Sequence, residues 1–189
     1  MLFRAIEFAA RAHAGQYRKQ TKIPYIVHPL AVCQMLIEAG CRDEVVVAAV
    51  LHDTIEDTSV TLDDIESEFG NTVAELVLAA TEPARPAAWE IRKQHTIDSL
   101  RSLSRDALYL ICADKLHNIF SIRNDISRLG EEAVWARFSR NKDKQRWYFE
   151  SLLSGLSEQL AGDKIGKTLV TALDQELKSV FGRQPDAHH

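Results

Sequence analysis

The sequence is poor in cysteine, with three in 189 residues. Cys33, Cys41 and Cys112 are odd in number and widely spaced, and they form neither a CxxC pair nor a zinc-ribbon pattern. Neither a disulfide framework nor a structural zinc site is therefore expected. Isolated thiols of this kind behave as small hydrophobic side chains in a reducing compartment. This cysteine usage favours a cytoplasmic protein.

Long apolar runs are also absent. No stretch of the sequence approaches the roughly 20 apolar residues that a membrane span requires. Near the N-terminus, Arg4 and Glu7 interrupt the apolar segment that a signal peptide would need. We therefore expect no membrane partner.

The chain has no excess of positive charge. Lysine and arginine total 23 against 27 aspartate and glutamate residues, which gives a formal net charge of −4. Because a protein that binds nucleic acid usually presents a basic face, nucleic acid is not expected as the partner. A small phosphorylated ligand needs only a local basic pocket. The sequence also lacks a glycine-rich phosphate loop and a serine or cysteine nucleophile motif.

Helical periodicity dominates the sequence, in which 46% of the residues are hydrophobic. Helices are predicted over 2–14, 24–39, 44–53 with Asp43 as the N-cap, 61–70, 71–81, 89–103, 106–128, 131–153 and 164–181. Two prolines mark a loop at 82–86. We find no repeats and no low-complexity linker. The sequence therefore predicts an all-α protein with one domain over 1–183 and a flexible tail at 184–189.

The strongest local feature is the segment 51–58, LHDTIEDT, at the end of the apolar run 45–51. We interpret that run as a central buried helix. If the helix continues past Asp53, His52 and Glu56 share one face and Asp53 and Asp57 share the adjacent face. Carboxylates beside such a run are costly unless a cation neutralises them, and a divalent metal would do so. The alternative is a helix that ends in a solvated acidic loop, with His52 as a core histidine.

Two further segments favour the metal. His28 lies within the apolar sequence YIVHP at 25–29, and Asp114 follows the apolar run LYLIC at 108–112. An unpaired imidazole or carboxylate is unfavourable in such surroundings. Each segment alone is more often structural. Three apolar helices that each insert a ligand-type side chain indicate one shared site.

The order His28, His52-Asp53, Asp114 resembles the H…HD…D signature of the HD superfamily of phosphohydrolases. Longer motifs resemble the hydrolase domain of RelA/SpoT homologues, especially the stand-alone small alarmone hydrolases. These motifs are GQYRK at 15–19 with PYIVHP at 24–29, LHDTIEDT at 51–58, and ADKLHN at 113–118. The resemblance spans about residues 2–155 and implies an HD-type helical bundle.

The resemblance also implies an activity. One divalent metal, typically Mn²⁺, would be bound by His28, His52, Asp53 and Asp114, and the attacking water would be positioned and deprotonated by Glu56 and Asp57. The implied reaction removes the 3′-pyrophosphate from a guanosine alarmone, ppGpp or pppGpp, so the partner is a phosphorylated purine nucleotide. No alarmone synthetase motifs are found, and hydrolysis without synthesis is therefore predicted. An adenosine alarmone of the ppApp type or another nucleotide remains an alternative substrate, and a non-catalytic nucleotide sensor is a further alternative.

By the same resemblance, Arg18 and Lys19 face the nucleotide and Asn118 contacts its ribose. The chain departs from the family at Phe120, where many members carry arginine. That departure bears on how the nucleotide is held.

Other features are left open. His117 lies beside the expected site, and His13 and His95 are expected at the surface or around the site. The basic stretch 137–146 is interleaved with aromatic residues and could bind phosphate or nucleic acid, but its simplest interpretation is a solvated helix face. In that region Tyr148 or Arg146 is a candidate to close over the substrate. Association into a homo-oligomer is also left open.

Overall fold

The computed structural model describes residues 1–82 and 88–182. Within them the regular structure is helical, apart from one antiparallel bridge between Tyr17 and Pro24. The helices are α1 (Leu2–Ala12), α2 (Val27–Ala39), α3 (Asp43–Leu51), α4 (Thr54–Asp57), α5 (Leu62–Phe69), α6 (Asn71–Ala80), α7 (Trp89–Ser99), a 3₁₀ turn η1 (Leu100–Ser102), α8 (Arg105–Leu129), α9 (Glu131–Trp135), α10 (Lys142–Gln159) and α11 (Lys164–Phe181). The predicted all-α fold is confirmed. The predicted tail at 184–189 and most of the loop predicted at 82–86 lie outside the described residues.

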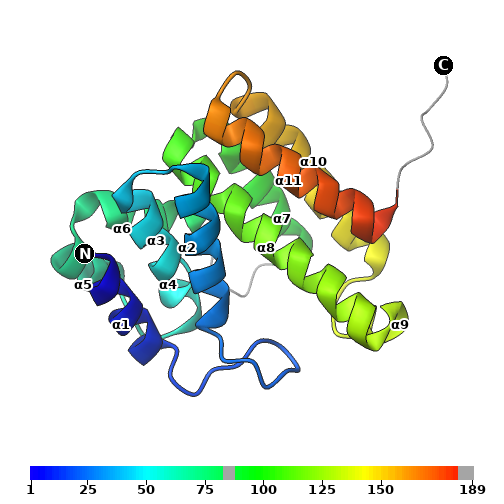
Figure 1. Ribbon diagram of the computed structural model, residues 1–189, viewed down its shortest axis with the longest axis horizontal. Coiled ribbons are helices and arrows are strands. Elements are labelled where there is room, and N and C mark those ends of the chain that lie inside the picture. The colour runs from blue at the N-terminus through cyan, green and yellow to red at the C-terminus, as the bar shows by residue number, and fades with distance from the viewer. Residues whose placement is uncertain (83–87, 183–189) are drawn as a thin grey trace.

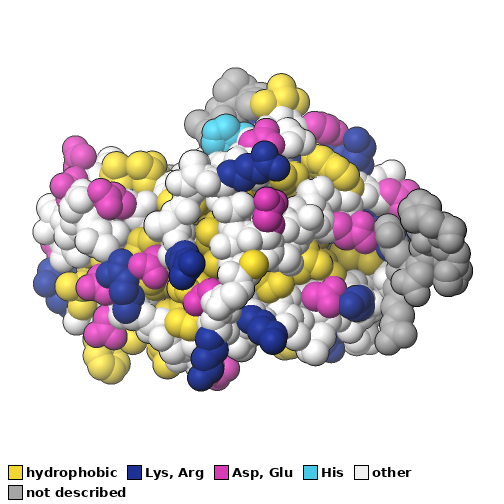
Figure 2. All heavy atoms as spheres, turned by 90° about the horizontal axis from the view of Figure 1, so that it is seen from above, with side chains coloured by type: hydrophobic (Ala, Val, Ile, Leu, Met, Phe, Trp, Pro, Cys, Tyr) yellow, Lys and Arg dark blue, Asp and Glu magenta, His cyan; other side chains and the backbone are white. Residues whose placement is uncertain are grey.

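Helix α8 forms the centre of the fold. Helices α2, α3 and α6 pack on one side of it, and α9, α10 and α11 pack on the other (Figure 1). Its residues 107–114 are all buried. No helix among the described residues is long and apolar enough to span a membrane. On the face seen in Figure 2, acidic and basic side chains are interspersed.

Helix α3 is the expected central buried helix, since every residue from Val45 to Leu51 is buried. It ends two residues earlier than predicted, because side chains bond to its last turn. Nδ1 of His52 donates to the carbonyl of Ala49, and Oγ1 of Thr54 donates to the carbonyl of Leu51, each at 2.7 Å. The chain restarts as α4, so the helix does not continue past Asp53 and no continuous helical face joins His52 to Glu56.

Other helix boundaries also differ from the prediction. Asp43 is not an N-cap: it is the first residue of α3, where its charge complements the helix dipole. The single helix predicted over 131–153 is divided into α9 and α10, because the Asn141 side chain accepts from the amide of Lys144 and caps a new helix. The helix predicted over 61–70 is α5, and a capping box between Thr61 and Asp64 fixes its start.

Candidate metal centre and its pocket

Three segments that are distant in sequence bring the candidate ligands together. His28 lies in the first turn of α2, His52 and Asp53 occupy the turn between α3 and α4, and Asp114 lies in the middle of α8. Both imidazoles are 2% exposed, and the carboxylates of Asp53 and Asp114 are 17% and 13% exposed. The apolar runs that the sequence displays fix these helices in the core, so the polar side chains converge at the edge of that core.

Nitrogen atoms of the two histidines lie close to oxygen atoms of the two carboxylates. Nε2 of His28 lies 3.1 Å from Oδ1 of Asp114 and 3.4 Å from Oδ2 of Asp53. Nε2 of His52 lies 3.2 Å from Oδ2 of Asp53 and 3.7 Å from Oδ1 of Asp114. One ligand atom from each of His28, His52 and Asp114 falls within 4.8 Å of the other two, a spacing at which they could hold a metal ion.

The electrostatics of the cluster fit a cation. Nε2 of His52 is buried and makes no hydrogen bond, while Nδ1 is committed to the Ala49 carbonyl. Burial alone would lower the pKa of His52, but the Asp53 and Asp114 carboxylates outweigh it and raise that pKa well above its usual value. The field that attracts a proton to His52 equally attracts a metal cation. Mixed imidazole and carboxylate ligands suit borderline to hard divalent metals.

Each carboxylate is held by further donors. Tyr25 Oη donates to Oδ2 of Asp53 at 2.7 Å. Lys115 Nζ donates to Oδ2 of Asp114 at 2.6 Å, and Nδ2 of Asn118 donates to Oδ1 at 2.7 Å. Burial would raise the pKa of Asp114, but Lys115 and the two histidines hold it well below its usual range. Both candidate ligand carboxylates are therefore oriented and ionised.

The two remaining acidic residues stand beside this cluster on α4. Glu56 and Asp57 are exposed, unlike the histidines. Oε2 of Glu56 accepts a 3.4 Å hydrogen bond from the backbone amide of Glu82. Partial burial of the carboxyl and the charges of Glu82, Asp53 and Asp57 raise the pKa of Glu56. A carboxylate with a raised pKa that remains accessible is suited to accept a proton from water.

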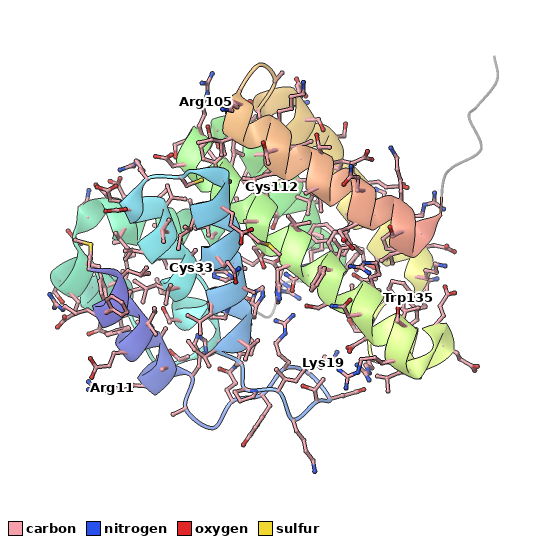
Figure 3. All side chains as sticks on the ribbon, viewed as in Figure 1. Arg11, Lys19, Cys33, Arg105, Cys112 and Trp135 are labelled. Atoms are coloured by element: carbon pink, nitrogen blue, oxygen red, sulfur yellow. The ribbon has the colours of Figure 1, made fainter. Side chains whose placement is uncertain are left out.

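A pocket of about 560 Å³ opens from the cluster, within the range of small-molecule sites. Its lining includes all three predicted nucleotide-facing residues, Arg18, Lys19 and Asn118, together with His28 of the cluster. Figure 3 labels Lys19 on the loop between α1 and α2, below α8. Nη2 of Arg18 donates to Oδ1 of Asn118 at 3.0 Å, and its guanidinium lies 5.6 Å from the ring centre of Tyr25. The structure thus joins the Arg18 loop to the metal cluster.

Sequence reasoning missed two lysines of the pocket. Lys93 of α7 and Lys115 of α8 line it beside Tyr148, which the sequence offered as a candidate. Lys93 Nζ lies 2.5 Å from Oε1 of Glu82 and 4.7 Å from the ring centre of Tyr148. The sequence signals were weak: a basic pair at 92–93 in a polar helix, and a lysine that lay inside the ADKLHN motif without an assigned role. Together with Arg18 and Lys19, these lysines give the pocket the local positive charge that a phosphorylated ligand needs.

The structure also locates the residues whose roles the sequence left open. Phe120 lines the pocket, and the Arg123 guanidinium lies 5.1 Å from its ring centre. His13 is buried and stacks on Tyr25 with ring centres 4.8 Å apart, while His95 is exposed. His117 is buried and contacts His28.

Most of the basic side chains at 137–146 form ion pairs within the fold. Arg137 pairs with Asp125, Arg140 with Glu90, Lys142 with Glu131 and Arg146 with Glu150. Arg137 and Arg140 lie in the connection between α9 and α10, and Arg137 lines the pocket, so the interpretation as a solvated helix face holds only for the residues on α10. Of its aromatic neighbours, Phe138 and Tyr148 line the pocket.

Comparison with known proteins places this geometry in a family. The HD domain family matches residues 5–144. The human guanosine-3′,5′-bis(diphosphate) 3′-pyrophosphohydrolase MESH1 is 38% identical over 164 residues, which cover 84% of this chain and 88% of that protein. A GTP pyrophosphokinase of Streptomyces coelicolor is 37% identical over 123 residues, but the match covers 64% of this chain and only 14% of that longer protein.

Two solved structures share the fold. The crystal structure of lmo0812 from Listeria monocytogenes superposes with a TM-score of 0.75 at 38% identity, covering 82% of this chain and 99% of that chain. A metazoan orthologue of SpoT, described as hydrolysing ppGpp, superposes with a TM-score of 0.76 at 26% identity, covering 96% of each chain. This chain belongs to the HD domain family, and its relatives include the SpoT-type ppGpp hydrolases.

Proposed function

We propose that this protein is a metal-dependent (p)ppGpp 3′-pyrophosphohydrolase, which releases pyrophosphate and leaves GDP or GTP. The observation that carries the proposal is the close approach of two imidazoles and two carboxylates beside a pocket that His28 lines together with cationic side chains. The 38% identity to a pyrophosphohydrolase along most of both chains supports the same substrate class. Hydrolysis without synthesis follows the sequence prediction.

His28, His52, Asp53 and Asp114 are the proposed ligands of one divalent cation. When bound, such a cation acts as a Lewis acid that polarises phosphoryl oxygens and makes water more acidic. We assign it as Mn²⁺, the metal that the family resemblance implies, and a mixed nitrogen and oxygen ligand set without thiolates is compatible with this metal. A cytoplasmic location and a role in the stringent response belong to the same proposal, and the three free cysteines support a reducing compartment.

The chain's own side chains supply the remaining steps. Glu56 accepts a proton from the attacking water, and Asp57 helps to orient that water. The water oxygen forms a bond to the phosphorus that carries the 3′-oxygen, the bond from phosphorus to the 3′-oxygen breaks, and the 3′-oxygen takes a proton from solvent. A positioned carboxylate base contributes about 10²–10⁴-fold to such a reaction.

Cationic residues hold the substrate during this step. Arg18 and Lys19 approach from the α1–α2 loop, and Lys93 and Lys115 approach from α7 and α8. Charge-assisted hydrogen bonds from these groups offset the charge of the diphosphate. Asn118 already bonds to Asp114, so a ribose contact from Asn118 would place the 3′-position next to the metal ligands.

A product assay tests the proposal directly. Purified protein with added Mn²⁺ is incubated with ppGpp, pppGpp or ppApp, and pyrophosphate and nucleotide products are measured. We expect pyrophosphate from the guanosine alarmones. The adenosine alarmone is included because the residues assigned here contact the diphosphate and the metal rather than the base. Absence of pyrophosphate from all three substrates would refute the function.

A paired substitution ties activity to the cluster. Asp53→Ala should abolish both Mn²⁺ binding and turnover. Asp174→Ala on α11 is the matched control, because Asp174 pairs with Lys178 of its own helix and is not among the residues that line the pocket. Turnover retained in Asp53→Ala would remove Asp53 from the site.

A further inference from the structure

His117 makes a close contact with a proposed metal ligand from the opposite side of the cluster. Its Nδ1 lies 2.7 Å from Nδ1 of His28, which is a hydrogen-bond distance. The two ring centres are 4.9 Å apart and the rings are tilted by 31°. Both residues are buried, at 2% exposure for His28 and 8% for His117. A direct bond between two buried imidazoles joins α2 to α8 at this point.

Only one of the two nitrogens in this contact can carry the proton. A neutral imidazole has one N–H donor and one acceptor nitrogen. The opposite nitrogen of His28, Nε2, faces the carboxylates of Asp114 and Asp53 at 3.1 and 3.4 Å. If Nε2 binds a cation, it must offer a lone pair, and the His28 proton must then sit on Nδ1. Nδ1 of His117 must then accept the hydrogen bond that Nδ1–H of His28 donates.

We propose that His117 is a positioning residue for His28. The Nδ1 acceptor of His117 fixes His28 in the tautomer and ring orientation that binds the metal. The inference rests on the metal site of the proposed function and extends it to a residue outside the ligand set. With its Nδ1 accepting, a neutral His117 carries its own proton on Nε2. His117 also lines the pocket, so this tautomer adds an N–H donor to the group of substrate-facing residues.

The arrangement predicts that the hydrogen bond reverses when the metal enters. Without metal, Nε2–H of His28 can donate to Asp114, and Nδ1 of His28 then accepts from Nδ1–H of His117. A bound cation would occupy the Nε2 lone pair of His28, so the His28 proton would lie on Nδ1 and the His117 proton on Nε2, with the displaced protons exchanged through solvent. Both rings are neutral before and after, and the proton count of the pair is unchanged.

Metal affinity in His117 variants gives the first test. Groups that orient a metal-binding histidine typically contribute 10–100-fold to metal affinity. His117→Ala should weaken the binding of Mn²⁺, measured by calorimetric titration, by that factor. His117→Asn should restore most of the affinity, because its Oδ1 can accept from His28 near the position of Nδ1. His95→Ala replaces an exposed histidine on α7 and should leave the affinity unchanged.

The Mn²⁺ affinities of these variants distinguish the role of His117 from the existence of the metal site. Equal Mn²⁺ affinity in wild type and His117→Ala would overturn the role of His117 and leave the metal site intact. An Asn variant as weak as the Ala variant would reject the hydrogen bond as the cause. A wild-type protein that binds no divalent cation would overturn both the inference and the proposed function. Thermal melting of each variant in EDTA checks that the metal-free fold is retained.

Tautomers of the wild-type protein give a test that needs no variant. Long-range ¹H–¹⁵N correlation spectra distinguish Nδ1–H from Nε2–H imidazoles, and Zn²⁺ serves as a diamagnetic probe of the site. We expect His117 to be the Nε2–H tautomer and His28 the Nδ1–H tautomer in the Zn²⁺-loaded protein. A loaded protein in which His117 retains Nδ1–H would overturn the proposal.

Discussion

The phenol of Tyr25 donates a 2.7 Å hydrogen bond to Oδ2 of Asp53. The same oxygen lies 3.2 Å from His52 Nε2 and 3.4 Å from His28 Nε2, so Tyr25 orients the carboxylate that bridges both histidines. Burial and the Asp53 and Asp57 carboxylates raise the pKa of Tyr25, which keeps its hydroxyl a donor. Because the Arg18 guanidinium lies over the Tyr25 ring, one aromatic side chain joins the nucleotide-facing loop to the metal cluster.

Tyr25→Phe should weaken Mn²⁺ binding by about tenfold, since it removes an oriented donor to a ligand carboxylate while preserving the ring. Calorimetric titration measures the change. Tyr17→Phe is the matched control, because Tyr17 is on the same loop and is 56% exposed. If both variants bind Mn²⁺ like wild type, the hydroxyl of Tyr25 has no role in orienting Asp53.

The pH dependence of turnover should identify Glu56. Activity requires ionised Glu56, so kcat/KM should fall as the pH drops through its pKa. Burial and three neighbouring carboxylates raise that pKa above the ordinary value of 4.5, so the acid limb should lie at a higher pH than for a solvated glutamate. Glu56→Gln should retain Mn²⁺ and lose about 10²–10⁴-fold in rate.

Substitution of a neighbour tests that assignment without changing the base. Glu82→Gln removes one of the charges that raise the pKa of Glu56 and leaves Arg92 and Lys93 uncompensated. Both effects favour ionised Glu56, so the acid limb should move to lower pH. Glu66→Gln, on an exposed position of α5, should not move it. An acid limb at the same pH in Glu82→Gln would point to a different titrating group.

Much of the site could be predicted because its ligands follow apolar segments. The run 45–51 had to be buried, so His52 and Asp53 at its end had to lie at the edge of the core. The turn at His52 could not be predicted from periodicity, because it depends on side-chain bonds to the Ala49 and Leu51 carbonyls. Such local bonds compete with the helix and leave little trace in the hydrophobic pattern.

Contacts between residues that are distant in the sequence could not be predicted either. His28 and His117 are 89 residues apart in the chain, and helical periodicity places each on a buried face without specifying a partner. The contact between Lys93 and Glu82, on either side of the α6–α7 connection, could not be predicted for the same reason. Only the packing of α2, α7 and α8 reveals which polar side chains complete the site.

Lys93, which the sequence analysis missed, should contribute to substrate binding. Lys93→Met keeps the aliphatic length and removes the charge, so the loss of one charge-assisted hydrogen bond should raise KM for ppGpp at least about tenfold. Steady-state kinetics with separate kcat and KM values measure the effect. Lys167→Met on α11 is the control, because Lys167 is exposed and does not line the pocket. A KM equal to that of wild type would limit Lys93 to its ion pair with Glu82.

Metal binding should also stabilise the fold, because the ligands come from α2, the α3–α4 turn and α8 and meet only in the native state. A ligand that binds the native but not the unfolded state stabilises the protein by about 2.7 kcal/mol at a concentration of 100 Kd. Urea unfolding with Mn²⁺ and with EDTA should show a difference of that size in the free energy of unfolding. Asp53→Ala should lose the difference, and its helical circular-dichroism signal in EDTA checks that it remains folded without metal. If Asp53→Ala gains as much stability from Mn²⁺ as wild type does, the cation binds elsewhere on the protein.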